Sequence, residues 1–175
     1  MIYVVPINNP IAGVVDYFME RLPTVFATQV EAYDPDFNAD VAFSDSRHQY
    51  NSTTLLAQLV SGSPSPASKV IGITNVDLYI PVLTFVFGEA QLGGTAAIAS
   101  SHRLRNAFYG MPEDRELLLE RLEKEVVHEL GHTYNLIHCQ DFNCVMYSSS
   151  SVGEIDVKGV DFCTECRRRL NLPNR

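Results

Sequence analysis

The chain has 175 residues, a hydrophobic share of 46% and a formal net charge of −8, which together fit one well-packed globular domain. This acidic balance argues against nucleic acid as a partner, because phosphate binding needs a basic surface. No apolar run approaches the roughly 20 residues that a membrane-spanning helix needs, and the first residues lack the signals of a secretory leader. We therefore expect a cytoplasmic monomer without nucleic-acid or membrane partners.

Strands and helices are expected to alternate along the first part of the chain. The predicted elements are a strand at 2–6, a helix at 11–22, a strand at 28–33, a capped helix beginning near Asn51 and a strand at 69–74. Two further strands, at 83–87 and 95–100, follow each other with only a turn-rich connection between them. Strands that alternate with helices and then end in such a pair predict an α/β fold whose mixed sheet has an antiparallel hairpin at its edge.

A long helix is expected from Pro112, since proline and acidic residues favour a first helical turn. Its far end carries His128-Glu129 and His132. Histidines at positions i and i+4 share one helical face, so that both imidazoles reach one Zn²⁺, and a glutamate beside the first is placed to act on a zinc-bound water. His138 is six residues beyond His132 and becomes the third ligand only if the chain turns back at Asn135, in the left-handed conformation.

Four cysteines fall within the last 40 residues, and their spacing is typical of a second metal site. Cys139 and Cys144 form one pair and Cys163 and Cys166 the other, which predicts a tetrahedral Cys₄ zinc that organises an irregular C-terminal segment. A disulfide framework is the alternative, although cytosolic thiols stay reduced. A redox role for Cys163-Thr-Glu-Cys166 is disfavoured by its late position in the chain. We expect two zinc ions per chain, one catalytic and one structural.

The histidine segment resembles the extended zinc motif of the metzincin metallopeptidases, and the cysteine pattern with Met146 resembles the archaemetzincins. Asn135 stands where the family has glycine. The resemblance implies a metzincin-like twisted mixed sheet, with Met146 as an apolar floor beneath the histidines. It also implies an edge strand near 83–90 that holds an extended substrate.

We expect one metallopeptidase domain with two subdomains. Residues 1–135 would carry the sheet and the active-site helix, and residues 136–175 the third histidine, Met146 and the Cys₄ site. Because His138 and Cys139 are neighbours that point to opposite sides of an extended segment, the second zinc is expected to fix the third ligand of the first.

The predicted reaction is hydrolysis of a peptide or protein substrate by a zinc-bound water, with Glu129 as the catalytic base. Tyr147 is either a helper for the developing oxyanion or, more simply, a surface tyrosine. An aminopeptidase is one alternative and needs an acidic group, such as Glu89, to hold the substrate's N-terminus. A zinc- or peptide-binding protein without turnover is the other, although such a protein has no need of a base at position 129.

Overall fold

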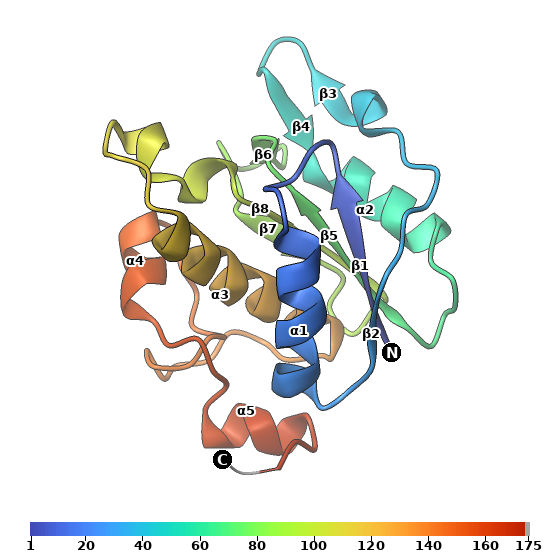
Figure 1. Ribbon diagram of the computed structural model, residues 1–175, viewed down its shortest axis with the longest axis vertical. Coiled ribbons are helices and arrows are strands. Elements are labelled where there is room, and N and C mark those ends of the chain that lie inside the picture. Colours follow the sequence, from blue (N-terminus) through green and yellow to red (C-terminus); the bar gives the residue numbers. More distant parts are fainter. Residues whose placement is uncertain (174–175) are drawn as a thin grey trace.

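The computed structural model describes residues 1–173, and its centre is a five-stranded sheet in the order β2-β1-β5-β8-β7 (Figure 1). The strands are β1 (Ile2–Ile7), β2 (Val30–Ala32), β5 (Lys69–Thr74), β7 (Gly88–Ala90) and β8 (Ala96–Ser100). All neighbouring pairs are parallel except β7 and β8, which pair antiparallel. The predicted mixed sheet with one antiparallel edge strand is therefore confirmed.

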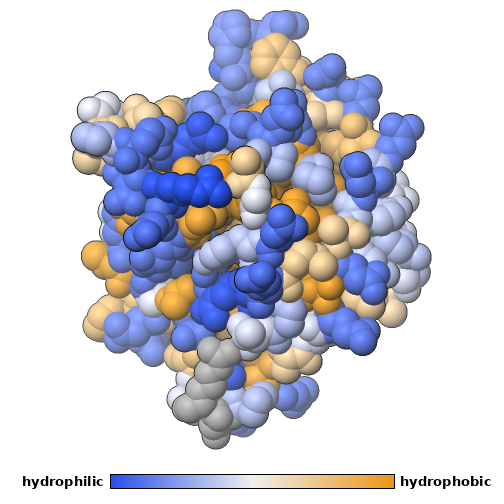
Figure 2. All heavy atoms as spheres, viewed as in Figure 1, coloured by the Kyte–Doolittle hydropathy of each residue, from blue (hydrophilic) through white to orange (hydrophobic). Residues whose placement is uncertain are grey.

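Both faces of this sheet are covered by helices, which agrees with the nearly continuous burial of side chains along its central strands β5 and β8. Helices α1 (Val14–Phe26) and α3 (Arg115–Thr133) pack on one face, where Ile71 and Ile73 belong to the larger core cluster. Helix α2 (Ser52–Ser61) packs on the other face, against Val70 and Ile98. In Figure 1, α1 and α3 lie side by side in front of the sheet. The surface on this side is mostly hydrophilic, with hydrophobic residues gathered near its middle (Figure 2).

Along the chain, the strands of a second, smaller sheet and three short 3₁₀ helices come between these larger elements. The small sheet has the order β3-β4-β6. Its strands and the 3₁₀ helices are β3 (Phe43–Ser44), β4 (Gln49–Asn51), β6 (Leu78–Tyr79), η1 (Ala39–Ala42), η2 (His102–Leu104) and η3 (Asn106–Tyr109). Among residues 1–173, no helix is both long and apolar enough to cross a bilayer.

Three predicted elements need correction. The helix expected at 11–22 lies at Val14–Phe26, because the left-handed backbone of Gly13 (φ 75°) delays its start. The long helix begins at Arg115 rather than at Pro112, because the Asp114 side chain caps it by accepting a hydrogen bond from the Leu117 amide. The stretch 83–87 is not a strand: it touches β6 only through an isolated bridge at Val86, and the strand begins later, at Gly88. The apolar run suggested a buried strand, but Leu83 is half exposed and has no partner strand there.

The C-terminal segment is irregular, as predicted, apart from two short helices. These are α4 (Val152–Val157), which packs against α3, and α5 (Thr164–Arg169). A capping box starts α4, with Ser151 and Glu154 exchanging side-chain and backbone hydrogen bonds. This short, well-fixed helix brings the residues after it back beside the middle of α3.

Candidate metal centres

One face of α3 carries a stripe of polar side chains at positions i, i+3, i+4 and i+7. The stripe consists of Glu125, His128, Glu129 and His132, and all four line one cavity. The opposite side of the helix packs into the core through Leu122 and similar residues. The apolar face of α3 therefore packs against the sheet, and the opposite face presents the predicted metal ligands and base to the cavity.

The hydrogen bonds of two histidines fix which nitrogen of each ring is free. His128 Nδ1 lies 2.8 Å from the Val145 carbonyl oxygen, and His132 Nδ1 lies 2.7 Å from that of Leu136. A carbonyl only accepts, so both Nδ1 atoms carry a proton and both Nε2 atoms present a lone pair. Burial also lowers the pKa of His128 well below its usual value, which keeps the ring neutral.

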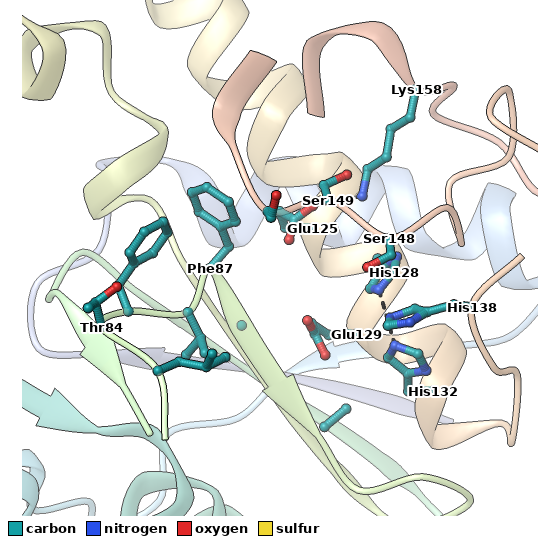
Figure 3. A pocket seen from close by; sticks show the side chains of 16 residues that line it. Thr84, Phe87, Glu125, His128, Glu129, His132, His138, Ser148, Ser149 and Lys158 are labelled. Atoms are coloured by element: carbon teal, nitrogen blue, oxygen red, sulfur yellow. Dashed lines mark hydrogen bonds and ion pairs between the residues drawn. The ribbon is translucent and has the colours of Figure 1, made fainter. Parts of the chain in front are cut away.

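These two lone pairs face each other across 3.1 Å (Figure 3). Two neutral acceptors at this distance repel unless a cation lies between them. Tetrahedral zinc ligands at about 2.05 Å from the metal are about 3.3 Å apart. The ligand nitrogens of His128, His132 and His138 all lie within 4.8 Å of one another, so the donor set fits a zinc ion.

The turn that brings His138 back is the one expected at Asn135. This residue has a φ of 67°, in the left-handed region, directly after the helix end. The Asn135 amide donates to the His132 carbonyl, and the Leu136 amide donates to that of Gly131, which together form a Schellman motif. The asparagine at the family glycine position therefore supports a regular helix end.

Glu129 lies between the histidines and strand β7 (Figure 3). The approach is close: a Cβ added at Gly88 would be 2.6 Å from Glu129 Cγ and 2.6 Å from the Ile98 carbonyl oxygen. Glycine at position 88 therefore makes room for the carboxylate. Burial raises the pKa of Glu129 well above its usual range, and the negative charge of Glu125 raises this pKa further.

Met146, expected as an apolar floor beneath the histidines, is completely buried and packs against α3 at Gly131. A side chain at Gly131 would collide with Met146 Sδ, so the glycine in the middle of the histidine motif allows α3 to rest on the methionine. Met146 is part of the larger hydrophobic core cluster. It contributes packing, as both readings of the sequence required.

The four cysteines gather in a separate cluster, with all Sγ atoms within 4.8 Å of one another. Cys139 Sγ lies 3.8 Å from Cys163 Sγ, and all four thiols are free, so the disulfide alternative is wrong. Thiolates bound tetrahedrally at about 2.3 Å from zinc are about 3.8 Å apart, which is the spacing seen here. Burial raises the pKa of the Cys144 thiol to about 11.

The cavity beside the histidines has a volume of about 590 Å³. One wall is the segment 83–87, which lies within the stretch expected to hold the substrate; the other includes residues that the sequence did not single out, namely Glu125, Ser148, Ser149, Ser150 and Lys158. Helical spacing from Glu129 could have indicated Glu125, which is one turn earlier, whereas the serines and Lys158 depend on the path of the C-terminal segment. Tyr147 does not line the cavity and is 36% exposed, which agrees with a surface tyrosine.

A mixed sheet backed by a helix with paired histidines, a third histidine after a tight turn and a buried methionine packed against that helix together define a metzincin-type zinc metallopeptidase. The sequence profile of Peptidase family M54 matches residues 17–172, and the chain belongs to this family. It is therefore a hydrolase of the zinc metallopeptidase class, as the archaemetzincin resemblance implied.

Similar proteins and solved structures support the same family assignment. The archaemetzincin of Methanocaldococcus jannaschii is 43% identical over 129 residues, which cover 74% of this chain and 70% of that protein. The crystal structure of the Archaeoglobus fulgidus archaemetzincin superimposes with a TM-score of 0.81 at 38% identity and covers 96% of this chain and 98% of that one. A zinc-dependent peptidase from Methanocorpusculum labreanum gives 0.86 at 30% identity, with 98% and 100% covered.

Proposed function

We propose that this chain hydrolyses peptide bonds at the cavity beside α3, with one zinc ion held by His128, His132 and His138. The observation that carries the proposal is the pair of unprotonated Nε2 atoms 3.1 Å apart at the cavity wall. Zinc bound there supplies a Lewis acid that makes water more acidic and polarises a carbonyl group. With three protein ligands, a tetrahedral site keeps one position open toward the cavity.

Glu129 is the proposed general base. Its carboxylate lies on the same helical face as the ligands, in the cavity, and Gly88 leaves it room beside β7. From there the carboxylate takes a proton from the attacking water and later passes it to the departing amine. The raised pKa of the buried carboxyl favours holding that proton between the two steps.

Cys139, Cys144, Cys163 and Cys166 are the proposed ligands of a second, structural zinc. The support is that all four Sγ atoms lie within 4.8 Å of one another and that the Sγ atoms of Cys139 and Cys163 are 3.8 Å apart. This zinc would hold the segment 136–175 together as a lower subdomain beneath the upper subdomain 1–135, in addition to the apolar residues of the segment that pack into the core, such as Val145 and Ile155. Two zinc ions per chain follow from the two sites.

The two centres are joined by one peptide bond, between His138 and Cys139. The Cys139 amide donates to the Met146 carbonyl, so the strand-like path at this point is already fixed on one side. The proposed second zinc fixes it on the other. Loss of that zinc would therefore displace His138 and weaken the first site.

An extended peptide substrate is proposed to pair with the free edge of β7, which is the last strand of the large sheet. Gly88 and Ala90 of this strand line the cavity, whereas Glu89 points away and accepts hydrogen bonds from Ser52 and Thr53. Glu89 is thus not placed to hold a substrate's amino group. This favours cleavage within a peptide over removal of its first residue.

The test is cleavage of a peptide library by the zinc-loaded chain, read by mass spectrometry, with N-acetylated and free peptides compared. We expect internal cleavage of both sets at similar rates. Cleavage of free peptides alone, one residue at a time, would establish an aminopeptidase. A chain with two bound zinc ions that cleaves neither set would contradict the proposed hydrolysis and support a binding role.

A further inference from the structure

A buried ion pair forms part of the cavity wall close to the histidines. Lys158 Nζ lies 2.8 Å from Glu125 Oε1, and the side chains are only 1% and 5% exposed. Both residues line the cavity (Figure 3). Glu125 belongs to α3, one turn before Glu129, whereas Lys158 directly follows α4, so two elements meet here to build one polar surface.

A third polar group in the same wall has no partner. Ser149 Oγ is fully buried and is one of two buried side-chain polar atoms among residues 1–173 that make no hydrogen bond. Buried hydroxyl groups in proteins are nearly always satisfied, and an exception in the wall of a binding cavity points to a ligand that completes it. Ser149, Glu125 and Lys158 line the same cavity, so the unpaired hydroxyl and the ion pair face one space (Figure 3).

We propose that this wall selects a substrate side chain that is uncharged and both donates and accepts hydrogen bonds, with the carboxamide of glutamine or asparagine as the best fit. The inference rests on the proposed peptidase function and names the residues that decide its specificity: Glu125, Ser149 and Lys158. An ammonium group carries three protons and a carboxylate offers about four acceptor positions, so each keeps capacity beyond their mutual bond. The amide oxygen accepts from Lys158, and the amide nitrogen donates to Glu125 or Ser149.

Other side chains fit this wall less well. The charges of Lys158 and Glu125 cancel, so an incoming carboxylate or ammonium group would bury a charge without a counter-ion of its own. An apolar side chain would cover the ion pair and leave Ser149 unsatisfied. Sites built from hydrogen-bonding groups reject ligands that lack them more strongly than apolar pockets reject an added polar group.

A residue of α3 serves as a matched control for the possibility that the Glu125–Lys158 pair is purely structural. Lys124 is equally buried, and its Nζ also ties α3 to α4, through the carbonyls of Ile155 and Asp156. Lys124 does not line the cavity. If Lys158 served only to hold the two helices together, Lys124→Met and Lys158→Met would change ligand binding alike.

The test measures binding rather than turnover. Four peptide hydroxamates share one backbone and differ only in the side chain that follows the zinc-binding group: glutamine, norleucine, glutamate or lysine. Their affinities are measured by calorimetry on the two-zinc protein, on Lys124→Met, on Ser149→Ala and on the double variant Glu125→Leu/Lys158→Met. Exchange of both partners of a buried ion pair for apolar residues of similar size preserves folds in general.

We expect the glutamine hydroxamate to bind the wild-type protein at least about tenfold more tightly than the other three. Lys124→Met should keep this order, Ser149→Ala should reduce the preference, and the double variant should prefer norleucine. Equal binding of all four, a preference for a charged side chain, or an equal change in Lys124→Met would overturn the inference and leave the peptidase proposal intact. Failure to bind any hydroxamate would instead overturn the proposed zinc centre, and this inference with it.

Discussion

The histidine centre and the cysteine centre lie one peptide bond apart, yet they are built in opposite ways. Two histidines sit on a long helix anchored to the sheet, and all three histidines border the cavity. Cys139 lies in an isolated β-bridge, Cys144 in a bend, and Cys163 and Cys166 at the start of a six-residue helix; none of them lines the cavity. Catalytic zinc needs an open position and structural zinc a closed one, and the two proposed centres differ in this way.

Glu129 provides the most severe test of the difference between the two centres, because only an open, catalytic centre has a use for a general base. We expect Glu129→Gln to reduce peptide cleavage by about 10²–10⁴-fold, because general acid–base catalysis contributes that much. Zinc content, measured by mass spectrometry, should be unchanged. Glu116→Gln, at an exposed position near the start of the same helix, is the control and should cleave normally. Normal turnover in Glu129→Gln would show that another group is the base.

A second test crowds the open centre without changing a polar group. A Cβ at Gly88 would lie too close to Glu129 and to the Ile98 carbonyl, so Gly88→Ala should displace the carboxylate. Misplacement by about 1 Å can reduce a rate by about 10²-fold, and we expect a loss of this order with zinc still bound. Gly153→Ala, where a Cβ meets nothing within 4 Å, is the matched control. Equal activity of the two variants would refute the crowding argument.

The closed centre is tested through its effect on the open one. Cys163→Ser should lower the affinity of the histidine site for zinc by about 10–100-fold, as changes in the groups that orient metal ligands do. Competition with a chromophoric chelator measures this affinity. Cys163 is 24 residues from Cys139 along the chain and belongs to the other cysteine pair, so an unchanged affinity would disprove coupling through the Cys₄ site.

The smallest effect is expected at the turn between the two centres. Asn135 has a left-handed backbone, which costs alanine about 1–2 kcal/mol and glycine little. Asn135→Ala should therefore lower the free energy of unfolding by about 1 kcal/mol, whereas Asn135→Gly should leave it equal or slightly higher. Urea unfolding in one zinc-saturated buffer gives both values. A more stable Asn135→Ala would contradict the observed turn.

The sequence predicted the elements whose signals are local. The strand at 69–74 was placed correctly to the residue because β-branched residues and flanking turns mark it. The left-handed turn at Asn135 followed from the ligand spacing together with the tolerance of asparagine for this conformation. The strand expected at 83–87 was wrong because an apolar run does not reveal whether a neighbouring strand is available to pair with it.

The cavity was the part of the site that the sequence could not supply. Lys158 reaches Glu125 across 33 positions, and the contact depends on how α4 packs against α3. Ser149 is one of several serines in a row, and only its buried, unpaired Oγ distinguishes it. Metal ligands are marked by residue type and spacing, whereas a specificity wall is marked by tertiary contacts.

The central claim is that one chain holds one open and one closed zinc centre. Native mass spectrometry of the wild-type protein next to His132→Ala tests it most directly. We expect two zinc ions in the wild type and one in His132→Ala, with the remaining ion lost after thiol alkylation. A wild-type protein with a single zinc, or a His132→Ala variant that still holds two, would contradict it.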